Sequence, residues 1–459
     1  MALNFLKLHP FIRATAHDKA IGTIVGAALG DSIGLYTEFL PRTECHRAYP
    51  SGKFSLLEAG KTPFRADSHR DKFDAGDWTD DTDQSLLLIL SYLHNFSNSN
   101  GNSLVVDASD IALRINIWIT QGLRCLDRPP LGIGQTIGRV VLDAEYLKDP
   151  EGVALNIWVK SNRNAAPNGS LMRTHPLGVM CVGKSLEETF TVAASVGRVT
   201  HVDPRCVVSC CLVVGLVRGI LRGEVVSEAD VDDLVEKAYV WVDAQDELKD
   251  PESRKPEGDW TEISASRPAG EESRLNIEEY RKHCNARDFR ELQLDDSQKM
   301  GYVYKCLGSA ILCLRSAMRL GLQPNSTGDE VFETLITELI MEGGDADTNA
   351  CVSGALLGAW LGHSRLPTNW KDGIRNSKWL FQKAQKLSLR AGIAESSSGV
   401  EEKDPDTAVD GGRGMLNKMQ LERRERDFVM MILEKQNKRQ QAVRQERAGK
   451  GVALNKWFR

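Results

Sequence analysis

Two short acidic segments that lie far apart in the chain carry the residue types that bind hard metal ions. The first, Gly76–Gln84, contains four aspartates and two threonines within nine residues. Some acid is expected where a helix begins, because Asp and Thr accept hydrogen bonds from free amides and negative charge is favoured there. Four carboxylates exceed what capping requires, and crowded carboxylates repel one another unless a cation neutralises them. Oxygen clusters of this kind suit Mg²⁺, Mn²⁺ or Ca²⁺.

The second segment, Glu342–Asn349, repeats the pattern. Two glycines free the backbone before Asp345, Asp347 and Thr348, and the strongly apolar stretch 350–361 follows directly. Taken singly, each segment is more typical of an elaborate helix N-cap than of a metal site. The two together favour a metal site that draws ligands from both ends of the chain.

Three further segments could contribute to such a site. Gly30–Glu38 is rich in small residues and ends in an acid, although alone this acid would be interpreted as a surface carboxylate. Leu131–Gly138 could cradle phosphate with backbone amides, but no strand pattern precedes it as in a dinucleotide fingerprint. Pro167–Arg173 places a turn before a helix, where free amides favour anions.

The elements that must position these residues are predicted to be helices. Apolar residues recur at helical spacing in eight segments, and sustained period-two alternation is scarce. The segments are 18–35, 84–96, 105–123, 186–195, 205–221, 302–320, 331–342 and 350–361. Several are rich in glycine and alanine, as in Gly354–Ala359, which permits close approach of neighbouring backbones. We therefore expect a tightly packed all-α bundle.

Composition narrows the class of protein. The formal net charge of −5 gives no global excess of positive charge, so phosphate attraction by the whole chain is not expected. Ten cysteines show neither zinc spacing nor a compact disulfide framework, which indicates reduced thiols in an intracellular protein. The apolar stretch 20–35 is broken by four glycines and an aspartate, unlike a signal peptide or a membrane span. A soluble cytoplasmic or nuclear protein without membrane contact is expected.

The chain divides into one domain and a tail. A single domain is expected over residues 1–390, with a charged surface insertion at about 243–297, where apolar periodicity fades. Residues 391–412 are predicted to be a linker and 413–459 a basic helical or partly disordered tail. The tail has thirteen basic and five acidic residues, a net charge of +8. A solvated helix is the simpler interpretation, and contact with nucleic acid or a protein partner is the alternative.

Five motifs, in this order, resemble the ADP-ribosylglycohydrolase family over about Lys19 to Arg365. They are Gly30-Asp31 with Glu38, Trp78-Thr79-Asp80-Asp81-Thr82, Asn168 to Arg173, Thr200-His201 and Gly344-Asp345-Ala346-Asp347-Thr348. The resemblance implies a compact orthogonal helical bundle with two central Mg²⁺ (or Mn²⁺) ions. The metal ligands that it implies are Thr79, Asp80, Asp81, Asp345, Asp347 and Thr348.

The same resemblance implies a reaction. The family cleaves the bond between the distal ribose of ADP-ribose and an acceptor, so an ADP-ribosylated protein is the expected substrate. Glu38 and Asp345 would be the catalytic residues that manage the proton of an attacking water. Matched residues that would bind the substrate are Gly132, Gly134, Asn168, Gly169, Ser170, Met172 and His201. The histidine is as consistent with capping a turn as with touching the ligand.

Two alternative functions remain open in the sequence. One is a protein of the same fold that binds ADP-ribose without cleaving it, although intact acids argue against this. The other is a two-metal phosphoesterase, which usually recruits histidine ligands, and neither acidic segment contains a histidine. The acceptor is open too. Ala165-Ala166-Pro167 lacks the side-chain donors of the serine-linkage enzymes, whereas Thr37-Glu38-Phe39 is nearer to the arginine-linkage enzymes. Because every candidate residue precedes the tail, removal of 411–459 is expected to leave hydrolysis of a small substrate unchanged.

Overall fold

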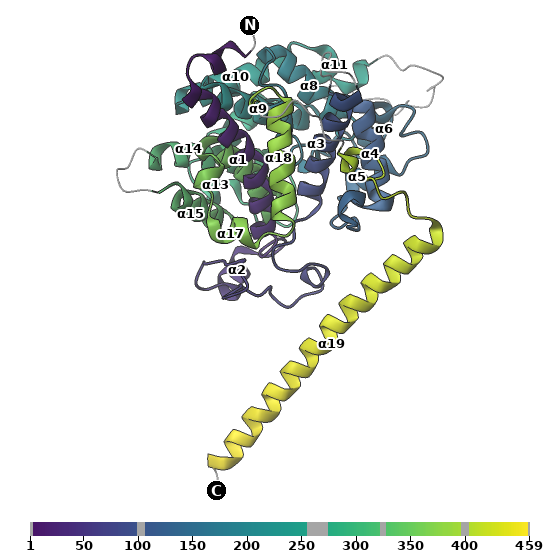
Figure 1. Ribbon diagram of the computed structural model, residues 1–459, viewed down its shortest axis with the longest axis vertical. Coiled ribbons are helices and arrows are strands. Elements are labelled where there is room, and N and C mark those ends of the chain that lie inside the picture. The colour runs from purple at the N-terminus through teal and green to yellow at the C-terminus, as the bar shows by residue number, and fades with distance from the viewer. Residues whose placement is uncertain (1–2, 99–105, 255–273, 322–326, 396–403, 458–459) are drawn as a thin grey trace.

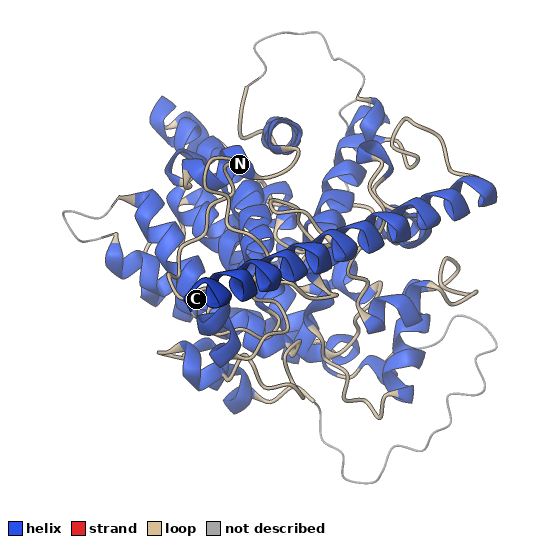
Figure 2. Ribbon diagram, turned by 90° about the horizontal axis from the view of Figure 1, so that it is seen from below, coloured by secondary structure: helices blue, strands red, loops and turns tan. Residues whose placement is uncertain are grey.

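The computed structural model describes residues 3–98, 106–254, 274–321, 327–395 and 404–457 (Figure 1). These residues form helices and loops, with isolated bridges and no strand among them (Figure 2). The all-α prediction is confirmed. The α-helices are α1 (Pro10–Gly34), α2 (Arg42–Ala48), α3 (Asp80–Asn98), α4 (Ala108–Gln121), α5 (Gln135–Val141), α6 (Pro150–Lys160), α7 (Pro176–Met180), α8 (Leu186–Arg198), α9 (Pro204–Arg222), α10 (Glu228–Asp243), α11 (Asp246–Lys249), α12 (Ile277–Cys284), α13 (Phe289–Leu292), α14 (Val303–Leu320), α15 (Gly328–Ile340), α16 (Ala346–Leu361), α17 (Thr368–Gly373), α18 (Ser377–Arg390) and α19 (Lys418–Trp457). The 3₁₀ helices are η1 (Asn4–Lys7), η2 (Arg70–Lys72), η3 (Arg124–Leu126), η4 (Asn168–Ser170), η5 (Pro251–Ser253), η6 (His363–Arg365) and η7 (Pro405–Thr407).

The antiparallel pair of α1 and α16 packs backbone against backbone. Four glycines of α1 lie so close to α16 that a Cβ on any of them would come within 2.4 Å of a carbonyl oxygen of α16. The pairs are Gly22 with Gly358, Gly26 with Gly354, Gly30 with Ala350, and Gly34 with Ala346. The step of four residues keeps every contact on one face of each helix. As a result, the end of α1 lies against the start of α16, and the segments that follow and precede them meet.

The helix α9 is a core element. It is buried from Pro204 to Leu221, and it is the one helix among the described residues that is long and apolar enough to cross a membrane. Its whole apolar stretch lies inside the bundle. All ten cysteines of the chain are buried and free of disulfides.

The segment that was predicted as a charged insertion contributes to the body where the structure describes it. Residues 255–273 lie outside the described residues. Beyond them, Tyr280 and Cys284 of α12 are buried, and the Tyr280 hydroxyl donates to the Val235 carbonyl over 3.1 Å. The helix was not predicted because it has only eight residues, four of them charged, and so shows no apolar periodicity.

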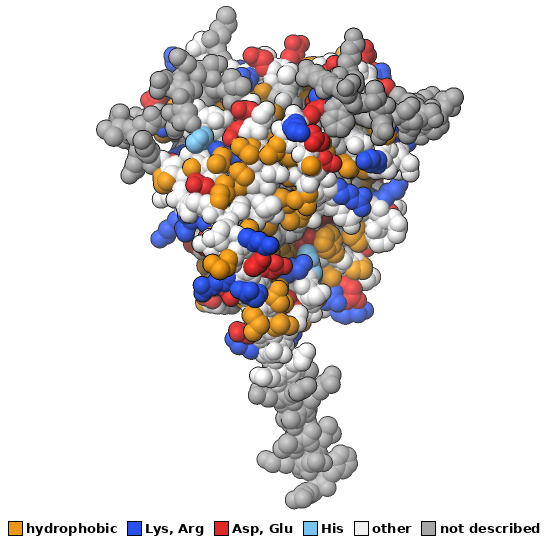
Figure 3. Space-filling view, turned by 90° about the vertical axis from the view of Figure 1, so that its right-hand side faces the viewer, with side chains coloured by type: hydrophobic (Ala, Val, Ile, Leu, Met, Phe, Trp, Pro, Cys, Tyr) orange, Lys and Arg blue, Asp and Glu red, His pale blue; other side chains and the backbone are white. Residues whose placement is uncertain are grey.

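The end of the predicted linker also packs on the body. Lys383 pairs with Asp404 over 2.6 Å, Trp379 Nε1 donates to Asp406 over 2.8 Å, and Gly411 lies too close to the backbone of Cys125 to admit a Cβ. The helix α19 then crosses the lower side of the body (Figure 2) and extends beyond it (Figure 1). On the face drawn in Figure 3, basic and acidic side chains are intermixed, in keeping with the small net charge.

Candidate active site

Asp31 of α1 fixes the start of α3, where Asp80 and Asp81 stand. The Asp31 carboxylate accepts hydrogen bonds from the Thr79 amide over 2.9 Å and from the Thr82 amide and hydroxyl over 3.0 and 2.6 Å. An aspartate from a neighbouring helix therefore caps α3. The carboxylates of the first turn of α3 are not needed for this cap and remain available for other partners.

Backbone pairing brings the turn after α1 beside the turn that opens α16. Gly343 and Gly344 adopt positive φ angles of 75° and 71°, which glycine tolerates without steric cost. The Phe39 amide donates to the Gly344 carbonyl over 2.6 Å, and the Gly344 amide donates to the Leu40 carbonyl over 2.9 Å. This pairing holds Glu38 next to the first residues of α16.

The two turns bring a set of carboxylates together. Glu38, Asp345 and Asp347 each offer an oxygen atom, and these atoms lie within 4.8 Å of one another. Asp345 Oδ2 accepts a hydrogen bond from Asn168 Nδ2 over 2.8 Å. Oδ1 of Asp347 and Oδ1 of Asp81 are buried without a hydrogen-bond partner among the described residues. Unpaired buried carboxylate oxygens are costly, so the cluster calls for a ligand.

Burial and mutual repulsion raise the pKa of the clustered aspartates. Burial is the largest cause of the raised pKa of Asp80, Asp81 and Asp347, and the next contributions come from Asp81 for Asp80, from Asp31 for Asp81, and from Glu38 for Asp347. Each of these charges disfavours the others in a dry environment. Carboxylate and hydroxyl oxygens are the donors that Mg²⁺ and Mn²⁺ accept, so the residues present fit a divalent cation.

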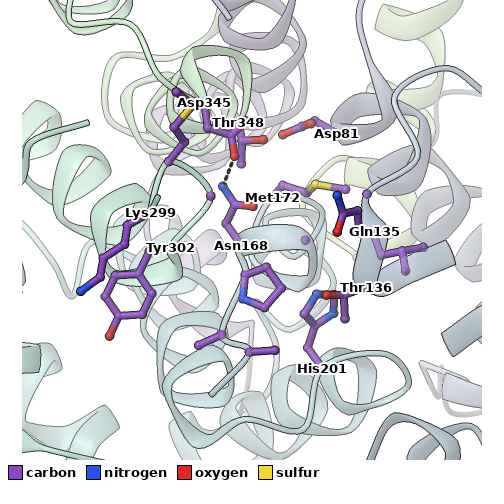
Figure 4. Close-up of a pocket in the computed structure, with 18 of the residues that line it drawn as sticks. Asp81, Gln135, Thr136, Asn168, Met172, His201, Lys299, Tyr302, Asp345 and Thr348 are labelled. Carbon is purple, nitrogen blue, oxygen red and sulfur yellow. Dashed lines mark hydrogen bonds between the residues drawn. The ribbon is translucent and has the colours of Figure 1, made fainter. Parts of the chain in front are cut away.

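The carboxylates lie at one end of a cavity of about 700 Å³. In Figure 4, Asp81, Asp345 and Thr348 lie at one end and His201 at the other, with Asn168 between them. Twelve of the fourteen residues predicted for the site line this cavity, namely Glu38, Asp80, Asp81, Gly132, Gly134, Asn168, Gly169, Met172, His201, Asp345, Asp347 and Thr348.

Two predicted residues do not line the cavity. The Thr79 hydroxyl donates to Asp31 over 2.9 Å and is also 3.1 Å from Asp81 Oδ2. Ser170 is buried, and its Oγ accepts a hydrogen bond from Cys210 Sγ over 3.5 Å. Both hydroxyls are thus engaged within the wall behind the cavity.

His201 presents a free nitrogen to the cavity. Its Nδ1 lies 2.7 Å from Thr200 Oγ1, which itself accepts from Arg173 Nη2 over 2.6 Å. Burial, and secondarily the charge of Arg173, lowers the pKa of His201 well below its ordinary value, so the ring is neutral. Its Nε2 is buried without a partner among the described residues. If the Thr200 hydroxyl donates to Nδ1, the ring proton lies on Nε2.

His69 is a site residue that sequence reasoning missed. Its Nε2 lies 2.6 Å from Glu38 Oε2. The next residue, Arg70, donates to the backbone carbonyls of Glu38 and Tyr36. Both residues belong to an irregular segment around η2, where no periodicity or motif points to a role. The contact depends on how this segment packs on the turn after α1.

The outer wall of the cavity carries further residues that were not predicted. They are Gln135 and Thr136 of α5, Arg205 of α9, and Lys299 and Tyr302 before α14 (Figure 4). The Tyr302 hydroxyl donates to Glu279 over 2.8 Å, and the Arg205 guanidinium lies 5.6 Å from the Tyr302 ring centre. Gln135 and Thr136 follow Gly134 directly and could have been found from it. Lys299 could not, because its short segment carries no motif, and Tyr302 was visible only as the start of the predicted helical segment 302–320.

Comparison with known proteins assigns this arrangement to a family. Residues 12–397 match the family model of ADP-ribosylglycohydrolase, which includes every cavity residue named above. The chain belongs to the ADP-ribosylglycohydrolase family. The family assignment and the helical fold predicted from the sequence are therefore confirmed. The family is one of hydrolases, and its model covers the residues of the cavity.

Relatives and a solved structure extend the comparison. The chain is 24% identical over 374 residues to the ADP-ribosylarginine hydrolase Tri1 of Serratia proteamaculans, covering 82% of this chain and 80% of that one. It is 21% identical to the ADP-ribosyl-[dinitrogen reductase] glycohydrolase of Rhodospirillum rubrum, covering 78% and 90%. It is 22% identical to the ADP-ribosylhydrolase ARH3 of Xenopus tropicalis, covering 80% and 95%. An ADP-ribosylglycohydrolase-related protein complex superimposes with a TM-score of 0.50 at 20% identity, covering 82% of this chain and 99% of that chain, which supports the shared fold.

Proposed function

We propose that this protein hydrolyses the glycosidic bond between the distal ribose of ADP-ribose and an acceptor, using two Mg²⁺ or Mn²⁺ ions, and releases ADP-ribose. One observation carries the proposal. Carboxylate oxygens of Glu38, Asp345 and Asp347 converge within 4.8 Å at the end of the cavity, where Asp81 and Asp347 also keep buried oxygens without partners among the described residues.

Six residues are proposed to hold the cations: Thr79, Asp80, Asp81, Asp345, Asp347 and Thr348. When bound, divalent cations at these oxygens would neutralise the crowded carboxylates and stabilise negative charge on oxygen atoms of the substrate and of water. Thr79 differs from the others because its hydroxyl is engaged with Asp31 and does not line the cavity. Because this hydroxyl donates its proton to Asp31, its oxygen keeps lone pairs that can contact a cation.

Glu38 is the residue proposed to manage the proton of the attacking water. One of its carboxylate oxygens is 2.6 Å from His69, and the side chain lies at the cavity edge with 6% of its surface exposed. In hydrolysis, the water oxygen bonds to the anomeric carbon as the glycosidic bond breaks, and the electron pair and a proton pass to the acceptor. Asp345, which is held by Asn168, is the second carboxylate at the reacting end.

The remaining cavity residues are proposed to bind the ligand. Gly132 has a φ of 85°, and a Cβ there would lie 2.5 Å from Asp80 Oδ1, so glycine serves both the turn and the space beside that carboxylate. A Cβ on Gly169 would lie 3.1 Å from the His201 ring. The backbone at Gly134 and Gly169 and the free Nε2 of His201 can therefore approach the diphosphate and ribose oxygens.

Arginine is the first acceptor to test. Two relatives with 24% and 25% identity carry the name ADP-ribosylarginine hydrolase Tri1. The loop residues Ala165 and Ala166 line the cavity without side-chain donors, unlike the corresponding loop expected of a serine-linkage enzyme.

A product assay tests the proposal. Peptides with ADP-ribose on arginine or on serine, and free ADP-ribose, are incubated with the protein in Mg²⁺ and in chelator, and the products are separated. Release of free ADP-ribose that needs the cation and is lost in Asp347→Asn supports the proposal. Tight binding of ADP-ribose without release would indicate a non-catalytic binding protein. Formation of AMP and ribose phosphate would indicate a phosphoesterase, and either result would overturn the proposal.

A further inference from the structure

The C-terminal helix α19 contacts two segments beside the cavity, the loop that leads to Gly132 and the segment around η2. Its first turns lie on the end of α4, where Arg424 donates to the Gln121 carbonyl over 2.7 Å. Further along, Lys435 pairs with Asp74 over 2.7 Å. Figure 2 shows the helix running across the lower side of the body. No part in the site was predicted for this tail, because every motif residue precedes it.

An aromatic residue of α19 supports the rim at Gly132. The ring of Phe428 packs on a small cluster formed by Leu35, Phe73 and Leu131. Leu131 directly precedes Gly132, which lies against Asp80 in the cavity. Phe428 thus covers the apolar back of the rim whose front faces the ligand, and it ties this rim to the segment around Phe73.

Asp71, a buried carboxylate of the η2 segment, receives its side-chain hydrogen bonds from α19. Asp71 of η2 is only 3% exposed. Its side chain accepts hydrogen bonds from Gln436 Nε2 over 3.0 Å and from the Arg439 guanidinium, and among the described residues these are its side-chain partners. A buried charge that loses a guanidinium partner is costly, so this pair fixes η2 against the helix.

The segment that α19 holds is the one that holds Glu38. His69 and Arg70 immediately precede Asp71; His69 contacts the Glu38 carboxylate, and Arg70 donates to the Glu38 backbone carbonyl. One short segment is therefore fixed on its outer side by Arg439 and contacts Glu38 on its inner side. A displacement of the outer contact changes the geometry of the inner one.

We propose that α19 is a strap that positions Glu38 for hydrolysis, with Phe428, Gln436 and Arg439 as positioning residues that act through the His69–Phe73 segment. The inference rests on the proposed function, because it assigns Glu38 a part in the reaction. It replaces the expectation that the tail is dispensable for hydrolysis.

Substitutions in the full-length protein test the strap. Arg439→Gln removes the charged partner of Asp71, and Lys438→Gln is the matched control, because Lys438 is exposed on the neighbouring position of the same helix. Arg439→Gln is expected to lower the single-turnover rate by roughly tenfold and to change ADP-ribose affinity by less than about threefold, since positioning affects the reacting group more than ligand binding. Arg439→Lys is expected to recover part of the rate. Lys438→Gln is expected to match the wild type.

A double-mutant cycle identifies the route of the effect. If Arg439 acts through Glu38, then Arg439→Gln causes no further loss of rate in a Glu38→Gln background. A loss of similar size in both backgrounds would overturn the proposal, and so would equal rates for Arg439→Gln and Lys438→Gln. Unchanged thermal unfolding in Arg439→Gln shows that the lost rate is not lost folding.

Hydrogen exchange separates the strap from the proposed reaction. The amides of Asp71 and Phe73 donate to the carbonyls of Asp67 and Arg70 within the held segment. Faster exchange of these amides in Arg439→Gln than in Lys438→Gln is expected, and this readout needs no activity. Absence of hydrolysis in the wild type would overturn the proposed function alone. Unchanged exchange would overturn the strap alone.

Discussion

The side-chain amide of Asn168 donates a hydrogen bond of 2.8 Å to Oδ2 of Asp345, which stands 177 positions later in the chain. This bond joins η4, in the wall of the cavity, to the first residue before α16. It also orients the Asp345 carboxylate, which belongs to the cluster, and leaves the other oxygen of Asp345 available for a different partner. This hydrogen bond therefore directly connects the cavity wall, which is proposed to bind the ligand, to the carboxylates that are proposed to hold the cations.

Asn168→Asp is expected to lower hydrolysis by at least about tenfold, because a hydrogen-bond donor becomes a carboxylate that faces Asp345. The cation-free variant is also expected to unfold at a lower temperature at neutral pH. Asn164→Asp is the control, since it adds the same charge at an exposed position of the same cavity. Equal losses in both variants, measured by product release and thermal unfolding, would assign the effect to added charge rather than to the lost bond.

Asp80→Asn and Asp347→Asn are expected to abolish cation-dependent hydrolysis and to leave the protein folded. Each change removes a proposed ligand charge, and it also relieves repulsion in a buried cluster, so thermal stability in chelator is expected to rise. Mg²⁺ is expected to stabilise the wild type and not the variants. Asp233→Asn, at an exposed site, controls for a lost charge. Near-normal turnover in both cluster variants would contradict the two-cation site.

The stability of the cation-free protein is expected to depend on pH through the same cluster. Burial raises the pKa of Asp31 from 3.8 to about 6, so the folded state holds a proton there that the unfolded state has released. A raised folded-state pKa gives stability at low pH that is lost as pH rises from about 4 to about 6. Asp80, Asp81 and Asp347, whose pKa values are also raised, extend this loss to higher pH. Unfolding titrations should show a smaller loss in Asp347→Asn, and an equal loss would contradict the assignment.

Local patterns account for what the sequence could predict. The helices with a long apolar stripe, such as α9 and α14, were visible from their spacing, and the acidic turns were visible because the ligands of each lie within one helical turn. The glycine- and alanine-rich stretch Gly354–Ala359 indicated close helix contact, and the structure shows that the partner of this helix, α16, is α1. Twelve predicted residues meet in one cavity because both acidic turns open helices that α1 aligns.

What the sequence could not predict depends on tertiary contacts between irregular segments. The contact of His69 with Glu38 joins two loops, and the bond from Arg439 to Asp71 joins a tail helix to a segment 368 positions away. Neither end of these contacts has a periodic pattern. The short helix α12 was missed for a related reason, because charged residues outnumber apolar ones and burial of Tyr280 and Cys284 supplies its stability.

The close contact of α1 with α16 is expected to make the free energy of unfolding sensitive to any side chain added between the two helices. Gly30→Ala would place a Cβ 1.9 Å from the Ala350 carbonyl oxygen, so the helices must separate, and a loss of more than about 3 kcal/mol in unfolding free energy is expected. Gly138→Ala, in α5, meets only the Ile133 side chain at 3.6 Å and is expected to be neutral or to stabilise by up to about 1 kcal/mol. Chemical denaturation measures both. Similar values for the two variants would contradict the packing argument.

Glu38 and Asp345 are expected to contribute differently to turnover and to ADP-ribose affinity. Glu38→Gln is expected to lower turnover by at least about a hundredfold, the scale of one acid–base group, while ADP-ribose affinity changes much less. Gln keeps the shape and a hydrogen-bond partner for His69 but cannot accept a proton. Asp345→Ala is expected to lose both affinity and turnover, because it removes a proposed cation ligand. Calorimetric titration of ADP-ribose, beside a single-turnover assay, separates the two effects. Equal losses of affinity and rate in Glu38→Gln would mean that Glu38 supports the cations or positions the ligand, and its catalytic assignment would then be wrong.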